Sequence, residues 1–406
     1  MRRPFLLTAA LVACSFLAVP SASASVSIGV SVNFFHDALA PYGDWVQTGQ
    51  FGLVWTPRHV AYGWRPYTRG HWVLTDADWT WVSDENWGWA TEHYGRWAYD
   101  GAYGWIWIPG DEWAPAWVAW RSGGDYVGWA PLPPQVDVFR AGFNLEIDPL
   151  AFSFVETRYL CEPRVYNRFV PAARNVTIVN ITQNVTNYTV VNGRVVDRGV
   201  EVRNVERATG HAVPRVELRD SVSIDAARGA RAAHGQLSVY RPSVSATPAA
   251  PSRNVRAFDR PMQRPEQLQR QQDQERRQFE SARDRERTQL SRIQEHEIKK
   301  APAPADDRGR AHSEPVTAER APSAVVRPAA PVRTSSSPEP RASARQGDPR
   351  PQTVDRKQLS DVHQQEKQAQ AQHETREHSA LAQRQERERQ AVQQNPPEKK
   401  SSNHDR

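Results

Sequence analysis

The sequence WGWATEHYGRWAYDGAYGWIW, at residues 87–107, contains five of the 15 tryptophans in this chain of 406 residues. All 15 lie between Trp45 and Trp129. Tryptophan and tyrosine favour strands, whereas clusters of glycine and aspartate favour turns. The stretch therefore predicts short strands joined by a turn. The uneven distribution indicates one dense aromatic module with other material attached, which argues against a uniform globular enzyme.

The tryptophans recur in a repeat of about 26 residues, in which a second tryptophan follows the first after 9 or 10 residues. The pairs are Trp45 with Trp55, Trp72 with Trp81, Trp97 with Trp107 and, in a shorter copy, Trp120 with Trp129. Alternation with period two, as in Trp105-Ile-Trp-Ile108, is typical of strands. We predict a mainly β fold, in which residues 25–135 form an antiparallel meander of hairpin repeats that makes a small barrel or sandwich.

Fifteen indoles exceed what a core of this size needs, because each buries roughly 150–250 Å². Two interpretations follow. The rings form a repetitive structural core, or some are exposed as a platform that stacks on sugar rings, on proline-rich peptide or on another copy. The expected platform residues are Trp81, Trp89, Trp97 and Trp107, organised by Arg96 and Arg121. We expect both arginines to stack on neighbouring indoles.

A second β region, rich in Val, Thr and Asn, is predicted over residues 136–225. Residues 175–191 alternate Asn and Thr with Val and Ile, which indicates a strand. The sequence Val190-Val-Asn-Gly-Arg-Val-Val196 predicts a hairpin with a type I′ turn, because Asn-Gly accepts positive φ at both central positions. Residues 200–225 suggest one more strand or a short helix.

Residues 226–406 form a tail rich in Pro, Gln and Arg that we expect to be disordered, since it has too few apolar residues to build a core. Two segments, 265–300 and 355–394, contain little proline and are helix-prone. Leu268, Phe279 and Leu290 recur every 11 residues, which is too sparse for a coiled-coil seam. The segments should be marginal charged helices, either solvated or ordered by a partner.

The N-terminus has the pattern of a signal peptide over residues 1–24. A basic start and an apolar stretch precede Ala22-Ser-Ala24, which has the form of a cleavage site. A lipid anchor at Cys14 is the alternative. After cleavage only Cys161 would remain, which we expect to be a buried small residue. No later apolar run is long enough to span a membrane. We expect an exported protein, periplasmic or extracellular.

Charge is segregated along the chain. Residues 25–135 carry a net charge of −6, whereas residues 136–406 carry +10. An acidic aromatic module repels phosphates, so we do not expect a nucleic-acid partner. Anionic polymers or lipids of the cell envelope are better electrostatic partners for the basic tail.

Candidate catalytic residues are few. Asp111 and Glu112 follow a Pro-Gly turn, and two carboxylates at the right separation can hydrolyse a glycoside. No Gly-x-Ser-x-Gly, phosphate-binding loop or His-Glu-x-x-His motif is present. The histidines at positions 36, 59, 71 and 93 lack the spacing of metal ligands. We expect no metal and no cofactor.

Several stretches together resemble a family. They are Trp87-Gly-Trp-Ala-Thr-Glu-His-Tyr-Gly-Arg-Trp97, Gly104-Trp-Ile-Trp-Ile-Pro-Gly110, Trp113-Ala-Pro-Ala-Trp-Val-Ala-Trp-Arg121, Gly128-Trp-Ala-Pro-Leu132 and, in the second half, Asn184-Val-Thr-Asn-Tyr-Thr-Val-Val-Asn-Gly-Arg-Val-Val-Asp-Arg-Gly199. Residues 42–220 resemble a bacterial Trp-rich secreted family of unknown function, and are loosely similar to YXWGXW-repeat proteins. The resemblance implies an envelope protein, in some members linked to FecR-like sensors, and implies no activity.

These observations favour an exported, non-enzymatic protein of the cell envelope that binds a glycan or protein partner through aromatic surface. One alternative is a cell-wall glycoside hydrolase that uses Asp111 or Glu112. Another is a regulatory partner of an envelope sensor.

Overall fold

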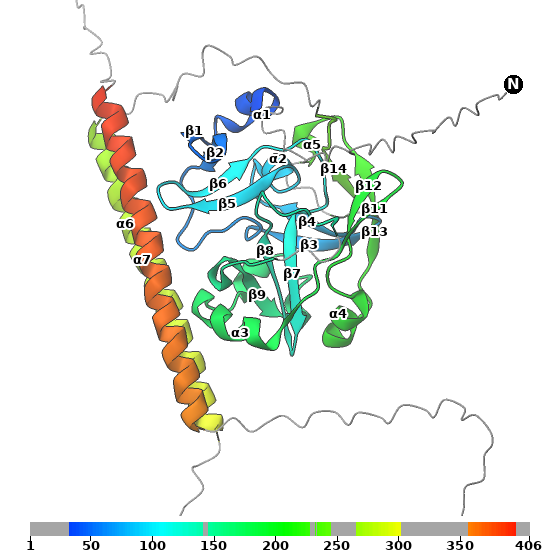
Figure 1. The fold of residues 1–406 in the computed structure, drawn as a ribbon, viewed down its shortest axis with the longest axis vertical. Coiled ribbons are helices and arrows are strands. Elements are labelled where there is room, and N and C mark those ends of the chain that lie inside the picture. Colours follow the sequence, from blue (N-terminus) through cyan, green and yellow to red (C-terminus); the bar gives the residue numbers. More distant parts are fainter. Residues whose placement is uncertain are drawn as a thin grey trace, which may run out of the picture.

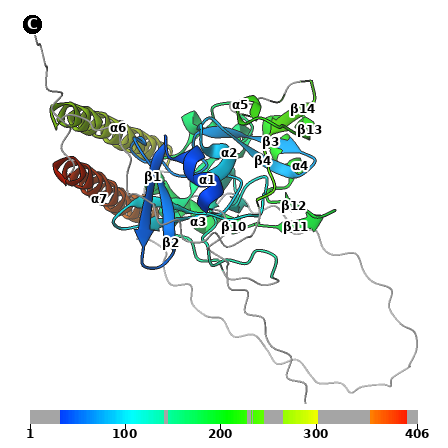
Figure 2. The ribbon, with the colours of Figure 1, turned by 90° about the horizontal axis from the view of Figure 1, so that it is seen from above.

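A computed structural model describes residues 32–140, 145–227, 232, 234–244, 265–301 and 356–394. The described residues between 32 and 244 form a β-rich body, here called the β body, and two long helices lie side by side against it (Figures 1 and 2). The predicted mainly β fold with a helical C-terminal region is confirmed. The predicted signal peptide, including Cys14, and most of the proline-rich segment between the helices lie outside the described residues.

The Trp repeat forms four β-hairpins. Their strands are β1 (Gly43–Thr48) with β2 (Gly52–Pro57), β3 (Gly70–Thr75) with β4 (Asp78–Ser83), β5 (Arg96–Asp100) with β6 (Gly104–Ile108), and β7 (Val118–Gly123) with β8 (Tyr126–Pro131). In every hairpin the two tryptophans of the repeat face each other across the strands. The predicted hairpin unit is therefore confirmed, with a cross-strand Trp pair at its centre.

The hairpins are distributed over three open sheets. The remaining strands are β9 (Ser153–Glu156), β10 (Gln183–Asn184), β11 (Tyr188–Val191), β12 (Arg194–Asp197), β13 (Arg215–Asp220) and β14 (Gln236–Val239). The strand orders are β1-β2-β6-β5, β10-β7-β8-β9 and β11-β12-β4-β3-β13-β14. Consecutive hairpins thus enter different sheets, and no closed barrel forms among the described strands. Residues of all three sheets pack into one buried cluster, which is the common centre of the β body.

Short helices connect and flank the strands of the β body. They are α1 (Val32–Leu39), α2 (Gly88–Thr91), α3 (Asn175–Ile181), α4 (Val202–Thr209) and α5 (Ile224–Ala227). The strand predicted over residues 175–191 is wrong at its start, where α3 forms. The buried Asn175 side chain donates to the carbonyls of Pro149 (2.9 Å) and Phe152 (2.7 Å) and fixes the start of that helix.

Two predictions for the second β region can be compared with the structure. The Asn-Gly hairpin is confirmed: β11 pairs with β12, with positive φ at Asn192 (51°) and Gly193 (72°). Residues 200–225 contain both a helix, α4, and a strand, β13. The β body also continues past the predicted boundary at residue 225, because β14 pairs in parallel with β13.

The tryptophans form the core of the β body. Twelve of the 15 are buried, and Trp87, Trp105 and Trp113 are half-buried. The glycine of each Gly-x-Trp triplet makes room for the indole on the paired strand. A Cβ at Gly43 would lie 2.2 Å from the Trp55 ring, and one at Gly70 would lie 2.7 Å from the Trp81 ring. The repeat therefore encodes a packing motif.

The two long helices, α6 (Pro265–Lys300) and α7 (Arg356–Gln394), match the predicted helix-prone segments. They run antiparallel, with Gln272 beside Gln385 at one end and Gln294 beside His363 at the other. We call them the helix pair. None of the helices in the described part of the chain has the length and apolar character required to cross a membrane.

Candidate functional site

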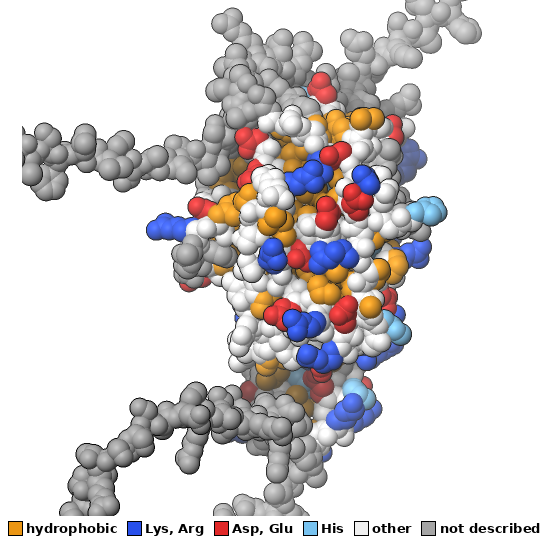
Figure 3. All heavy atoms as spheres, turned by 90° about the vertical axis from the view of Figure 1, so that its right-hand side faces the viewer, with side chains coloured by type: hydrophobic (Ala, Val, Ile, Leu, Met, Phe, Trp, Pro, Cys, Tyr) orange, Lys and Arg blue, Asp and Glu red, His pale blue; other side chains and the backbone are white. Residues whose placement is uncertain are grey.

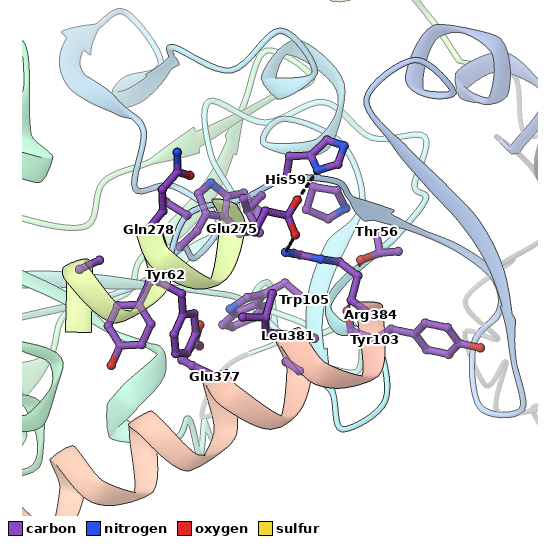
Figure 4. Close-up of a pocket in the computed structure, with 18 of the residues that line it drawn as sticks. Thr56, His59, Tyr62, Tyr103, Trp105, Glu275, Gln278, Glu377, Leu381 and Arg384 are labelled. Carbon is purple, nitrogen blue, oxygen red and sulfur yellow. Dashed lines mark hydrogen bonds and ion pairs between the residues drawn. The ribbon is translucent and has the colours of Figure 1, made fainter. Parts of the chain in front are cut away.

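A cavity of about 680 Å³ lies between the β body and the helix pair. Figure 4 shows residues from both parts of the chain pointing into it. The β body contributes β2, the loop that follows it and the β5–β6 hairpin, whereas the helix pair contributes one face of each helix. The volume lies within the range of about 300–1,000 Å³ that is usual for small-molecule sites.

One wall of the cavity is aromatic and continues a face of the core. Strand alternation places Trp97 and Tyr99 of β5 on the same face, opposite Trp107 and Trp105 of β6. The Trp97–Trp107 half of this face is buried in the β body. The other half projects beyond the core, so that Tyr99 is 41% exposed and Trp105 is half-buried. Their ring centroids lie 5.6 Å apart, at an interplanar angle of 83°.

The opposite wall carries charged and amide side chains. Glu275 of α6 lies 2.7 Å from Nδ1 of His59 and 3.3 Å from the Arg384 guanidinium of α7 (Figure 4). Burial raises the pKa of the Glu275 carboxyl, but the His59 hydrogen bond and the Arg384 charge outweigh it and hold the pKa at about 2. The Nε of Arg384 is buried and has no hydrogen-bond partner among the described residues.

A second carboxyl group, that of Glu377, lines the cavity from α7. It accepts a hydrogen bond from the backbone N–H of Gly63 (3.2 Å). Burial raises the pKa of this carboxyl to about 7, although Arg65 lies near enough to oppose the rise. Close to neutral pH the site therefore has one permanently ionised carboxylate, Glu275, and one that gains and loses a proton.

The predicted platform residues Trp81, Trp89, Trp97 and Trp107 lie in the core, with at most 7% of each exposed. The prediction that they form an exposed platform is wrong, because the hairpins of different sheets turn these faces toward a common centre. The interpretation of the tryptophans as a repetitive core holds for most of them. The aromatic surface that lines the cavity lies next to the buried pair, at Tyr99, two residues after Trp97 on β5, and at Trp105, two residues before Trp107 on β6.

The two arginines differ in role. The Arg96 guanidinium lies 3.5 Å from the centroid of the Trp117 ring, so the predicted stacking is confirmed, and burial lowers its pKa to about 10. The stacking predicted for Arg121 is not what its contacts show. Its side chain donates to the backbone carbonyls of Val179 (2.7 Å) and Thr182 (2.5 Å), at the C-terminal end of α3. Carbonyl groups at the C-terminal end of a helix have no intrahelical N–H donor, and the Arg121 guanidinium provides the missing donors.

Other candidates from the sequence lie away from the cavity. Asp111 and Glu112 are exposed on the loop that follows β6 and do not line it. His93 is buried, its ring stacks on Trp113 at 5.3 Å, and burial lowers its pKa to about 4. Cys161, predicted to be buried, is half-buried, and burial raises the pKa of its thiol to about 11, which is typical of an unreactive cysteine.

Two buried carboxyl groups serve the core. Glu92 accepts hydrogen bonds from the Trp81 indole (2.8 Å) and from the Tyr67 backbone (2.9 Å), and burial raises its pKa to about 7. Asp197 accepts from the Trp120 indole (2.7 Å), and burial raises its pKa well above its usual value. Asp197 was missed by sequence reasoning, because nothing near it in the sequence shows that an indole 77 residues away needs an acceptor.

The rest of the described surface is a weaker candidate for a binding site than the cavity. On the face of the β body opposite the helix pair, the described acidic, basic and hydrophobic side chains are interspersed (Figure 3). Within the described ranges, no three or more His, Cys, Asp or Glu side chains are grouped so that they could hold a metal ion. The cavity is the most developed candidate site.

Comparison with known proteins gives one match. Residues 36–136 match the model of a family of unknown function (DUF6600). No curated protein and no solved structure matches the chain. The matched segment contains all four Trp hairpins and ends before β9, so it covers the aromatic wall of the cavity without the helix pair. The resemblance to a domain of unknown function is confirmed for this segment.

Proposed function

We propose that this chain is an exported, non-enzymatic binding protein of the cell envelope, and that it holds a saccharide in the cavity between the β body and the helix pair. The observation that carries the proposal is the composition of the cavity. An open aromatic pair, Tyr99 and Trp105, faces a wall in which carboxylate, guanidinium and amide groups lie beside apolar side chains such as Phe279 and Leu381. Such walls suit a sugar ring, whose C–H face stacks on an aromatic ring while its hydroxyl groups bind polar side chains.

Export is part of the proposal and is supported by the N-terminal residues. The basic start, the apolar run and the Ala22-Ser-Ala24 sequence have the order of a secretory signal. Outside the cell membrane, glycans are the abundant polymers that expose both hydroxyl groups and apolar ring faces. A saccharide therefore fits the expected location and the chemistry of the cavity.

The test is a titration of the intrinsic tryptophan fluorescence of the full chain with soluble cell-wall fragments, a neutral oligosaccharide and an acidic oligosaccharide. Trp105→Ala should weaken binding about tenfold, because it removes one ring of the pair. Trp113→Ala is the matched control, since Trp113 is also half-buried but does not line the cavity.

Two results would contradict the proposal. One is that no saccharide changes the fluorescence or releases heat in calorimetry. The other is that both tryptophan variants weaken binding equally, which would place the ligand elsewhere. Release of new reducing ends during the titration would contradict the non-enzymatic part alone.

A further inference from the structure

The helix pair carries glutamates at a regular interval of 11 residues. They are Glu275, Glu286 and Glu297 on α6, and Glu366, Glu377 and Glu388 on α7. Eleven residues make three turns of a slightly unwound helix, so each set forms a stripe along one side of its helix. At 1.5 Å per residue, successive glutamates in a stripe are about 16 Å apart.

Five of these six glutamates contact the β body. The partners are His59 for Glu275 (2.7 Å), the Ala172 N–H for Glu286 (2.9 Å), Arg174 for Glu297 (2.8 Å), Arg174 and Thr177 for Glu366 (3.5 and 3.0 Å), and the Gly63 N–H for Glu377 (3.2 Å). The sixth, Glu388, accepts from Gln272 within the helix pair (3.1 Å). The stripes thus form a row of carboxylates that meets donors of the β body along most of the interface.

Apolar contact at this interface is sparse. Phe279 of α6 packs edge-on against Tyr62 of the β body, with 4.7 Å between ring centroids. Leu290 packs with Ala172 and Ala173. Between the two helices the buried side chains are largely polar, among them Gln272, Gln294, Gln370 and Gln385. Helices with so little apolar surface are marginal in water unless they pack on another element.

We propose that α6 and α7 fold onto the β body together and act as a latch, which is a removable wall of the cavity that docks and leaves as one unit. The row of glutamates and its donors is the docking interface. Because the glutamate row docks through ion pairs and hydrogen bonds, we expect release of the latch to depend on salt and on the loss of individual ion pairs.

A latch of this kind regulates the proposed site. The cavity is complete only while the helix pair is docked, because α6 and α7 form one of its walls. A ligand that contacts both walls must bind the docked state more tightly and so shift the population toward it. This role in ligand binding rests on the proposed function, whereas the docking itself does not.

The test measures amide hydrogen exchange of the full chain, with Arg174→Ala as the main variant. Arg174 pairs with one glutamate of each helix, and it does not line the cavity. We expect exchange in α6 and α7 to accelerate together by about tenfold or more, while exchange in the Trp hairpins stays unchanged. Raising NaCl from about 0.05 to 0.5 M should accelerate exchange in the same two helices of the unmodified chain.

Arg168→Ala is the matched control. Arg168 pairs with Glu162 inside the β body (3.0 Å), so its loss should leave both helices protected. Glu297→Gln weakens the same interface from the helix side, together with the contact between Glu297 and His363 of α7 (2.9 Å), and serves as a second variant in case Arg174→Ala misfolds. The latch is overturned if the two helices exchange independently, or if neither Arg174→Ala nor Glu297→Gln differs from the control.

A final arm separates the two proposals. A saccharide that binds should slow exchange in both helices, and with Trp105→Ala the same slowing should need about tenfold more saccharide, without release of the helices. If Arg174→Ala releases the latch but no saccharide alters exchange, the latch holds and the proposed function fails. If a saccharide binds without protecting either helix, the regulatory role of the latch is wrong.

Discussion

At the scale of single residues, the buried tryptophans need a hydrogen-bond acceptor for each indole N–H group. A buried donor without an acceptor costs about 1–3 kcal/mol. Seven indoles donate to backbone carbonyls, and three donate to the carboxylates of Glu85, Glu92 and Asp197. The buried N–H groups of Trp72, Trp87, Trp89 and Trp113 have no partner among the described residues. Indoles of similar burial are therefore expected to contribute differently to the free energy of unfolding.

This difference gives a prediction for two neighbouring rings. Trp72 and Trp129 are both buried, with ring centroids 5.5 Å apart, but only Trp129 donates to a carbonyl, that of Tyr67 (2.8 Å). Trp129→Phe should lower the free energy of unfolding by about 1–3 kcal/mol more than Trp72→Phe, because it leaves a buried carbonyl without its donor. Urea denaturation of the two variants measures the difference. Equal losses would mean that ring packing alone sets the cost.

At the scale of the element, the unit is the hairpin with a Gly-x-Trp start. The sequence predicts this unit well because its signals are local: the pair of tryptophans, the turn residues and the alternation lie within about 15 residues. The same is true of the Asn192-Gly193 turn. Prediction failed at α3, where alternating Asn, Thr, Val and Ile residues fit a strand. There the outcome depends on the Asn175 side chain, which binds carbonyls 23 and 26 residues away.

The glycine of the hairpin unit can be tested directly. A Cβ at Gly43 would lie 2.2 Å from a ring carbon of Trp55 and 2.3 Å from the Thr56 carbonyl oxygen, so both strands of the hairpin would have to move. Gly43→Ala should lower the free energy of unfolding by about 1–3 kcal/mol or more. Gly49→Ala is the control, since no atom lies within 4 Å of a Cβ there and its φ is not in the left-handed region. Thermal unfolding should separate the two, and a similar midpoint for both would contradict the packing role.

At the scale of the whole molecule, the site combines segments that are far apart in the sequence. Glu275 meets His59 across 216 positions, and Glu377 meets Gly63 across 314. The sequence predicts both long helices nearly to the residue, because helix propensity is local. It does not predict where they pack, because one apolar residue in 11 gives no recognisable seam. The 11-residue spacing of the glutamates is the one feature of the sequence that indicates this packing. It can be interpreted only with the fold, which places the hydrogen-bond donors of the β body opposite the glutamates.

The docking of the helix pair should depend on pH through Glu377. Burial raises the pKa of this carboxyl to about 7 in the docked state, from an ordinary value of 4.5. A raised pKa means that docking favours the protonated form. The stabilisation is complete below pH 4.5 and is lost as the pH rises through about 7. The groups that interact electrostatically with Glu377 include the Gly63 N–H, Arg65, Glu286 and Arg384, and the hydroxyl groups of Tyr62 and Tyr99.

Glu377→Gln isolates this contribution, because glutamine keeps an acceptor for the Gly63 N–H and does not ionise. The measurement is the protection factor of α7 amides, corrected for intrinsic exchange, at pH 5 and pH 8. The ratio of variant to unmodified chain should rise about tenfold or more between these values. His373, whose pKa burial lowers, is present in both chains and cancels from the ratio. If the ratio of protection factors is the same at pH 5 and pH 8, Glu377 does not change its protonation state on docking, and the proposed pH dependence is wrong.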